Sequence, residues 1–296
     1  MKGQIKDQVQ VLVSADGKDY QSAGRFNFDL RWKVALGIEV PTPFKRLTFR
    51  EALDRYGIDK PDTRFGMELV DFTEEFRASS FKVFSGTIAN GGVVKAINAK
   101  GLACATQGQL ETMTELAKSF GAKGLAYIKV EGGEWKSPIV KFLSDAEKAA
   151  LTSKLKIEEG DLILFAADQW LNACEILGKI RLYCADVLKA SGKLAIPADR
   201  FDFLWVVDFP LFEHSEEQQA FVAAHPPFTS PRPEDVPSLL SDPGRVKARA
   251  YDVVTSLLML TVTWFFVGNV LARTLLAGLA GAGLARFALW RRLRRA

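Results

Sequence analysis

The sequence predicts an α+β fold. Between about residues 65 and 166, short β-rich runs alternate with helix-forming runs, and Gly-rich turns separate them. The 296 residues are 48% hydrophobic, which is enough for one large core or two modest cores and excludes a disordered chain. Six arginines and no acid follow Asp252, so the body before them is slightly acidic, and its bulk charge does not favour a nucleic-acid surface.

The first segment, residues 1–30, is predicted to form a β-hairpin. Val9, Val11 and Val13 alternate with other residues, as on one face of a strand, and ADGK at residues 15–18 supplies a turn. Charged residues occur from position 2 onward, with no apolar run of signal-peptide length, so export is not predicted.

Helix signals follow. Thr48 with Glu51 three residues later is the pattern of a capping box, which predicts that a helix begins there. A longer helix is predicted over residues 166–190. Seven residues recur at steps of three and four, and the apolar ones are expected in the core: Trp170, Ala173, Cys174, Leu177, Ile180, Arg181 and Cys184.

Strands and helices between these two helices make up a predicted module at residues 66–166, and a further strand follows it. The runs of the module are 66–72, 73–79, 81–87, 93–98, 106–120, 124–129, 144–155 and 161–166. Residues 201–209 are almost continuously apolar, which predicts a strand buried on both faces.

Local motifs for a metal or a nucleotide are absent from the sequence. Cys104, Cys174 and Cys184 have no CxxC spacing and no neighbouring histidine, so buried or partly buried free thiols in a reducing compartment are predicted. No GxxxxGK or GxGxxG loop occurs, and the glycine pairs at residues 91–92 and 132–133 are predicted to lie in turns. Neither a metal ligand nor a catalytic residue is predicted.

Two segments are far more specific than these patterns. FLWVVDFPLFE at residues 203–213 is an apolar strand that ends in a proline and an acid, and HPPFTSP follows at residues 225–231. Seven further segments occur in the order expected for one family: WK (32–33), LGIEVPTPFKRLTF (36–49), RYGIDKPDTRF (55–65), FKVF (81–84), GAKGLAYIKV (121–130), KSPIVKFL (136–143) and ARAYD (248–252). Together they resemble the bacterial aspartyl-tRNA synthetases, a class II family, over about residues 31–253.

The resemblance implies a division of the chain. Residues 31–65 and 167–252 would be parts of the class II antiparallel-sheet core. Residues 66–166 would be the inserted GAD domain, which the family shares with the B subunit of bacterial glutamyl-tRNA amidotransferase and which has no assigned catalytic residues. Residues 253–296 remain as a hydrophobic and basic tail.

His225 is the one candidate substrate-binding residue. The resemblance places it at the first histidine of the family's HHPF motif, in the amino-acid pocket, where an imidazole could donate a charge-assisted hydrogen bond to the carboxylate of aspartate. Here the second histidine of the motif is Pro226. The alternative is that His225 only caps a proline-rich turn.

Other polar residues near these motifs are predicted to be structural. His214 is expected in a solvated loop, and the charged turn DKPD at residues 59–62 is expected at a solvated corner. Asp208 and Glu213 flank the end of the apolar strand; they could face an active cleft, but isolated acids at strand ends are more often structural, and that role is expected here.

The chain lacks several segments that the family uses for adenylation. Missing are the anticodon-binding OB domain, the Ser-Pro-Gln segment, the Arg-Asp-Glu motif, the Glu-x-Gly-Gly-Gly-Ser stretch and the Gly-Leu-Asp-Arg motif. Without their cations, charge on a transferring phosphoryl centre would not be stabilised. ATP and Mg²⁺ are cofactors of the full-length family, none is predicted for this fragment, and autonomous aminoacylation is not expected.

The tail has two interpretations. From Val253 to Ala272 twenty residues carry no charge, and at about 1.5 Å per residue they would span about 30 Å, the thickness of a bilayer's hydrocarbon core. Trp264 and RRLRR at residues 291–295 would then be an interface anchor and a cytoplasmic flank. Alternatively, a run rich in Leu, Ala, Gly and Arg is typical of GC-rich DNA translated out of frame, and the resemblance stops abruptly at this point.

Two functions follow from these observations. The first is a truncated, cytoplasmic aspartyl-tRNA synthetase-like protein that is inactive alone. The family reaction is the ATP-dependent attachment of aspartate to tRNA, so tRNA and aspartate are the implied partners, with a homodimer as a further option. The second is a non-catalytic GAD-domain module, tethered to a membrane from Val253 to Ala272, that binds tRNA or a synthetase partner.

Overall fold

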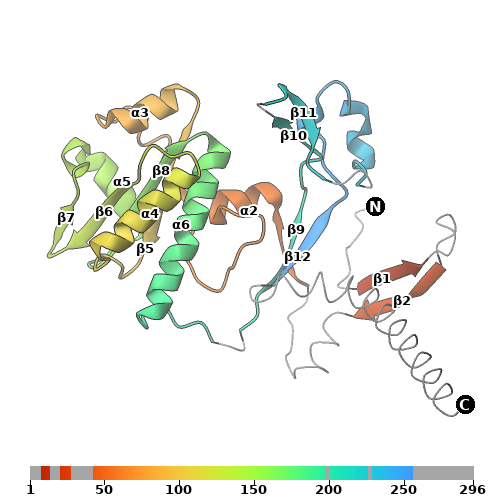
Figure 1. Ribbon diagram of the computed structural model, residues 1–296, viewed down its shortest axis with the longest axis horizontal. Helices are drawn as coiled ribbons and strands as arrows, with labels where there is room; N and C mark the ends of the chain where they lie inside the picture. Colours follow the sequence, from red (N-terminus) through yellow and green to blue (C-terminus); the bar gives the residue numbers. More distant parts are fainter. Residues whose placement is uncertain are drawn as a thin grey trace, which may run out of the picture. The chain divides into compact units, whose positions relative to one another are not determined.

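The computed structural model describes residues 8–13, 21–27, 43–197, 200–215, 217–225 and 229–255 (Figure 1). Strands β1 (Gln8–Val13) and β2 (Gln21–Asn27) pair antiparallel, which confirms the predicted hairpin. The predicted span that ends at Ala272 lies outside the described residues beyond Thr255. Among the residues that are described, no helix combines the length and the apolar character that crossing a membrane would require.

The largest of the described sheets is antiparallel and has five strands, in the order β4-β5-β8-β6-β7 (Figure 1). With its helices, this sheet is called the central module here. The strands are β4 (Val70–Asp71), β5 (Val93–Ala99), β6 (Ala126–Glu131), β7 (Glu134–Lys136) and β8 (Leu162–Asp168). Gly132 and Gly133 form the two-residue turn between β6 and β7 with φ of 69° and 76°, a backbone that favours glycine, and this confirms the predicted turn.

Helices cover both faces of this sheet. The helices are α3 (Lys82–Ala89), α4 (Gln107–Ser119), α5 (Asp145–Leu155) and α6 (Trp170–Ala190), and η1 (Val140–Phe142) is a short 3-10 turn. Strand β8 shows the arrangement directly: Leu162 and Leu164 lie in the hydrophobic cluster of α4 and α6, whereas Ile163 lies in the cluster of α3 and α5. Since side chains alternate along a strand, the apolar run of β8 from Leu162 to Ala167 is explained by burial on both faces.

Helix α2 (Phe49–Tyr56) begins as the sequence predicts. The backbone N–H of Glu51 donates to Oγ1 of Thr48 at 3.1 Å, and the backbone N–H of Thr48 donates to Oε2 of Glu51 at 2.7 Å. These hydrogen bonds lower the pKa of the Glu51 carboxyl group. Helix α2 ends at Gly57, which has φ of 70° and lies against Gly178 of α6.

A buried charged residue joins α2 to the central module. Lys95 of β5 is fully buried, and its Nζ lies 2.7 Å from Oδ1 of Asp54 in α2. The indole N–H of Trp170 donates to the same oxygen at 3.0 Å. Partial burial works against ionisation of Asp54, but the hydrogen bonds from Lys95 and Trp170 outweigh it and lower the pKa of Asp54.

Arg181, in the middle of α6, is fully buried and fixes the loop between α2 and β4. Its guanidinium donates to the carbonyl oxygens of Asp62 at 2.8 Å, Phe65 and Gly66 at 3.0 Å, and Met67 at 3.1 Å. The guanidinium carbon also lies 4.1 Å from the centre of the Phe65 ring. Burial lowers the pKa of Arg181 to about 10, so the group remains cationic at neutral pH.

This loop corrects one expectation. The DKPD turn at residues 59–62 is not simply a solvated corner, because Asp62 is largely buried and its carboxylate accepts from Nη2 of Arg64 at 2.7 Å. Lys60 of the same turn lies 3.8 Å from the carboxylate of Asp252, so that two of the family-like segments meet here. The turn is held against α6 because Arg181 donates a hydrogen bond to the carbonyl oxygen of Asp62, and the local sequence does not indicate this contact.

A second sheet has the order β12-β9-β3. Strand β9 (Phe203–Val207) confirms the predicted apolar strand and lies next to β3 (Lys45–Thr48), and β12 is Tyr251–Thr255. Strands β3 and β9 are parallel, with Lys45 opposite Leu204. The expected antiparallel sheet therefore does not hold for this pair, because the whole central module forms the crossover between the two strands.

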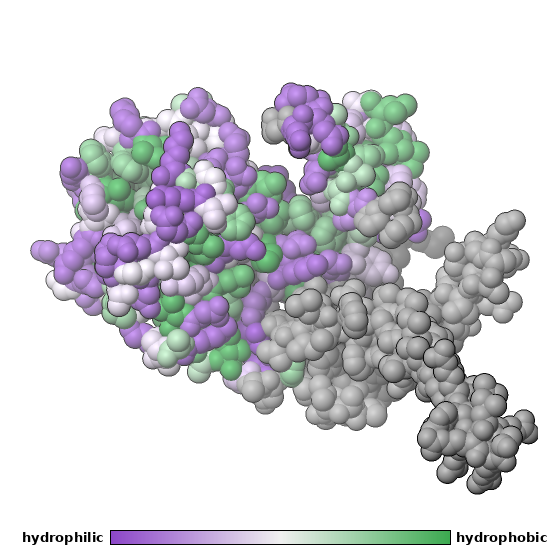
Figure 2. All heavy atoms as spheres, viewed as in Figure 1, coloured by the Kyte–Doolittle hydropathy of each residue, from purple (hydrophilic) through white to green (hydrophobic). Residues whose placement is uncertain are grey.

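The residues between β9 and β12 form smaller elements. They are β10 (Phe212–Ser215), β11 (Ala220–Ala223), η2 (Pro233–Ser238) and η3 (Pro243–Arg245). Three of their large hydrophobic residues are exposed: Phe221, Val236 and Leu240. Figure 2 shows one face of the molecule coloured by hydropathy. The predictions did not include these elements.

The contact between Gly57 and Gly178 is testable by substitution. A Cβ at Gly57 would lie 2.2 Å from the carbonyl oxygen of Cys174, and φ is positive there. Gly57→Ala should therefore lower the free energy of unfolding by about 2–4 kcal/mol, the sum of backbone strain and overpacking. Gly91→Ala is the matched control: its φ is 80°, but nothing lies within 4 Å of the added Cβ. Equal losses in urea unfolding for the two variants would contradict the packing argument.

The role of Arg181 predicts a large loss of stability for Arg181→Met. Methionine keeps the apolar stem but leaves four inward carbonyl groups without their donor, so the free energy of unfolding should fall by about 3 kcal/mol or more. Arg77→Met is the control, since the Arg77 side chain is 59% exposed and pairs only with exposed Glu74. A change below about 1 kcal/mol in Arg181→Met, measured by urea unfolding, would show that the loop does not depend on the guanidinium.

Candidate functional site

The candidate site lies where three family-like segments meet. His225 lies two residues after the end of β11, and the backbone N–H of the intervening Ala224 donates to the carbonyl oxygen of Leu211 at 3.0 Å. This hydrogen bond ties the start of HPPFTSP to the end of FLWVVDFPLFE. Pro226, Pro227 and Phe228, which complete the motif's core, lie outside the described residues.

The segment at residues 246–249 runs between the other two. On one side, the N–H of Ala248 donates to the carbonyl oxygen of Phe209 at 2.8 Å, and on the other the N–H of Arg249 donates to that of Ser230 at 2.8 Å. Pro210 bridges Lys247, and Pro231 bridges Ala248. The ARAYD segment thus holds the strand end and the segment after His225 at a fixed separation.

The His225 side chain is half-buried. Its ring meets the Phe209 ring edge-on, with the ring centres 5.7 Å apart, and Phe209 in turn packs against Phe49 at 5.2 Å. Nε2 of His225 is buried and has no hydrogen-bond partner among the described residues. A buried nitrogen without a partner is unfavourable, and a ligand carboxylate would satisfy it.

The acids beside the apolar strand have different surroundings. Asp208 has φ of 67° and forms an ion pair with Arg232, which lies just after the HPPFTSP segment. Glu213 lies in β10, is exposed, and stands opposite Val222 of β11. The predicted structural role fits Asp208, whose carboxylate ties the strand end to residue 232.

His214 corrects a second expectation. It lies in β10 opposite Phe221, with the ring centres 5.6 Å apart, and not in a loop. The side chain is exposed, as expected, but the β10–β11 hairpin gives it an aromatic neighbour. Only the pairing of these two short strands reveals that contact.

The three cysteines are free, as predicted. Cys174 and Cys184 are buried in α6, and burial raises the pKa of each thiol to about 12. Cys104 is exposed, in contrast to the expected burial, because it lies in the turn before α4. Its Sγ is 3.0 Å from Nζ of Lys193.

The described side chains do not gather into a metal-binding cluster: within this part of the chain, no group of three or more His, Cys, Asp or Glu residues is arranged to hold a metal ion. Arg232, the arginine just after the His225 motif, is paired with Asp208.

Comparisons with known proteins agree with the sequence motifs. The GAD domain family model matches residues 84–177, which cover the sheet from β5 to β8 and the first part of α6. The chain is 58% identical over 223 residues to the aspartate–tRNA(Asp/Asn) ligase of Opitutus terrae, which is 75% of this chain and 38% of that protein.

Two further relatives give the same result. Identity is 47% over 234 residues with the aspartate–tRNA(Asp/Asn) ligase of Thermodesulfovibrio yellowstonii, covering 75% of this chain and 38% of the relative. It is 48% over 223 residues with the aspartate–tRNA ligase of Geobacillus kaustophilus, covering 75% and 37%. This chain thus spans less than two fifths of the length of these relatives. The predicted resemblance is confirmed: the chain carries a GAD domain and, over three quarters of its length, is related to part of the aspartate–tRNA ligases.

Proposed function

We propose that this chain is the aspartate-recognising part of a class II synthetase-like protein, that His225 binds the carboxylate of aspartate, and that the 296 residues alone do not complete aminoacylation. The observation that carries the proposal is the buried, unpartnered Nε2 of His225 within the described residues, at the histidine of the family-like HPPFTSP motif. The cytoplasm is the proposed location.

The surroundings of His225 support carboxylate binding. Phe209 meets the imidazole edge-on, and the hydrogen bond from Ala224 to Leu211 holds the backbone just before His225, which reduces the ordering that binding would require. A hydrogen bond from an imidazole to a carboxylate is charge-assisted and is stronger in a partly buried site than in water.

Adenylate formation requires groups that the chain does not supply. Four family segments that would bind the nucleotide are missing from these 296 residues: the Ser-Pro-Gln segment, the Arg-Asp-Glu motif, the Glu-x-Gly-Gly-Gly-Ser stretch and the Gly-Leu-Asp-Arg motif. ATP, Mg²⁺ and tRNA therefore remain proposals as ligands of a fuller assembly, and a homodimer remains a prediction. The step that we assign to this chain is binding of the amino acid, not its activation.

Aspartate binding is testable with the two histidines of the chain. His225→Ala should weaken binding of L-aspartate by about 10-fold or more, because one hydrogen bond to a charged group is lost. His214→Ala is the matched control, since His214 is exposed and lies in the neighbouring strand β10. Isothermal titration calorimetry of the purified chain measures both. Unchanged binding in His225→Ala, or equal weakening in the control, would contradict the assignment.

The proposal that this chain does not form aspartyl adenylate can be tested separately. The purified chain with aspartate, ATP and Mg²⁺ should show no exchange of labelled pyrophosphate into ATP, because the phosphate-binding cations are missing. An aspartate–tRNA ligase of full length serves as the positive control. Exchange above the level without enzyme would overturn the inactivity proposal while leaving aspartate binding intact.

A second candidate function is a non-catalytic GAD-domain module that binds tRNA or a synthetase partner. The observation that favours it is that the central module has helices on both faces of its sheet and two hydrophobic clusters of its own. Such a unit can hold a binding surface without a complete catalytic core. The membrane tether from Val253 to Ala272 lies outside the described residues and remains a prediction.

A further inference from the structure

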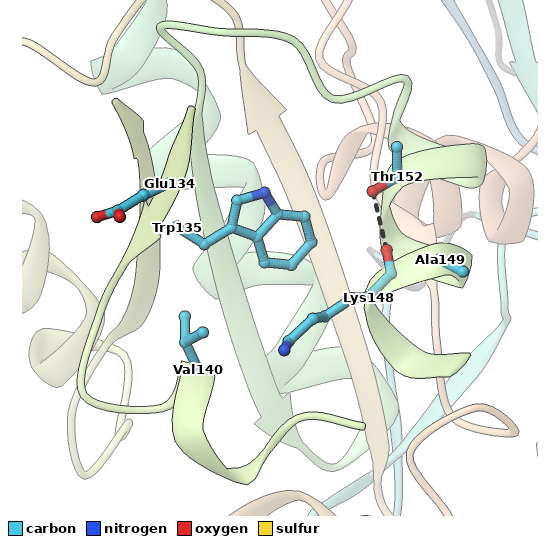
Figure 3. A pocket seen from close by; sticks show the side chains of 6 residues that line it. All are labelled: Glu134, Trp135, Val140, Lys148, Ala149 and Thr152. Atoms are coloured by element: carbon cyan, nitrogen blue, oxygen red, sulfur yellow. Dashed lines mark hydrogen bonds between the residues drawn. The ribbon is translucent and has the colours of Figure 1, made fainter. Parts of the chain in front are cut away.

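A pocket of the central module lies far in sequence from His225. It opens between the β6–β7 hairpin and α5 and has a volume of about 540 Å³ (Figure 3). Its lining residues are Glu134, Trp135, Val140, Lys148, Ala149 and Thr152. This volume is within the range of small-molecule sites, about 300–1,000 Å³.

The indole of Trp135 is the main apolar surface of the pocket. Figure 3 shows the indole extending from β7 toward α5, and it packs in part against the hydrophobic cluster of α3 and α5. No hydrogen bond to the indole N–H of Trp135 occurs in the described part of the chain, although the indole of Trp170 is paired. An aromatic plane with a free donor is thus presented to the pocket.

Lys148 supplies the charge in the pocket. Its side chain reaches from α5 toward the indole of Trp135 (Figure 3), and its Nζ is 3.7 Å from Oδ1 of the fully exposed Asp145. Glu134 precedes Trp135 in β7, and its carboxylate points away from the pocket, as alternation along a strand requires. The hydroxyl of Thr152 is already used, because it donates to the carbonyl oxygen of Lys148 at 2.9 Å.

From this arrangement we infer that the pocket binds a nucleotide unit, with the nucleobase stacked on Trp135 and the phosphate at Lys148. An aromatic plane beside one cation matches a planar base beside one anion, and stacking on an aromatic side chain together with phosphate contacts is how proteins hold single-stranded nucleic acid. The slightly acidic body adds no long-range attraction, so affinity rests on these two local contacts.

The same chemistry can come from an unpaired stretch of RNA or from a free mononucleotide, and we assign it to RNA because the pocket is open to solvent, so that a nucleic-acid chain can continue on either side of the bound unit. This site deepens the second candidate function by naming the surface at which RNA would bind. It does not depend on aspartate binding at His225.

Fluorescence anisotropy of the full chain with a labelled single-stranded adenylate hexamer tests the site. Trp135→Leu should weaken binding at least about fivefold through loss of stacking, and Trp135→Phe should retain most of it. Lys148→Gln should weaken binding and reduce the slope of log affinity against log salt by about 0.7, the value for one phosphate contact on a single strand. Circular dichroism checks that each variant is folded, and Lys148→Gln tests the site even if the tryptophan variants unfold.

Lys118→Gln is the matched control. Lys118 lies on α4 and pairs with Glu115 three residues earlier, as Lys148 pairs with Asp145 on α5, but it does not line the pocket. Equal weakening in Lys118→Gln, or no hexamer binding by the unaltered chain, would overturn the site.

Competition and a longer ligand separate the remaining outcomes. If AMP displaces the labelled hexamer at a concentration similar to that of unlabelled hexamer, the pocket is supported but its ligand is a free mononucleotide, not RNA. If unlabelled hexamer displaces it and AMP does not, RNA is supported as the ligand. If whole tRNA binds and the Trp135 and Lys148 variants leave its affinity unchanged, this site is overturned while the second candidate function stands.

Discussion

The guanidinium of Arg181 is the interaction on which the described fold depends most. A buried cation is costly unless hydrogen bonds replace its water, so residues 62–67 must turn their carbonyl groups toward α6. That requirement sets the path of the loop between α2 and β4. It thereby joins the segment that resembles a synthetase core to the central module, and the contact of Gly57 with Gly178 and the pair of Lys95 with Asp54 strengthen the same junction.

Hydrogen bonding of backbone groups also organises the candidate site, although the chain carries no complete catalytic core. Residues 246–249 bond to the backbone of Phe209 and of Ser230, and the N–H of Ala224 donates to Leu211, so the backbone just before His225 is tied to the end of the apolar strand. Nε2 of His225 is one of four buried side-chain atoms without a hydrogen-bond partner among the described residues, together with Nη1 of Arg181, Oδ1 of Asn98 and Oε1 of Glu147. Of these four side chains, only His225 lies in the motif that the family resemblance assigns to substrate.

Local patterns predicted local structure well. The capping box at Thr48, the alternating valines of β1 and the apolar run of β9 are each explained by neighbours within a few residues, and all three elements form. The family resemblance identified His225 as a candidate because this histidine belongs to a specific motif, HPPFTSP. The pocket of Trp135 and Lys148 had no such signal, since its residues come from a hairpin and a helix that meet only in the folded chain.

By itself, the sequence determined the α+β class, the family relation and the candidate histidine, because capping, strand alternation and ordered motifs are properties of neighbouring residues. Tertiary structure decided the parallel pairing of β3 with β9, the burial of Asp62 in the DKPD turn, the strand position of His214 and the exposure of Cys104. Each of these depends on contacts between segments far apart in the chain, where the burial of a charge or a backbone group selects one arrangement that no local preference contains.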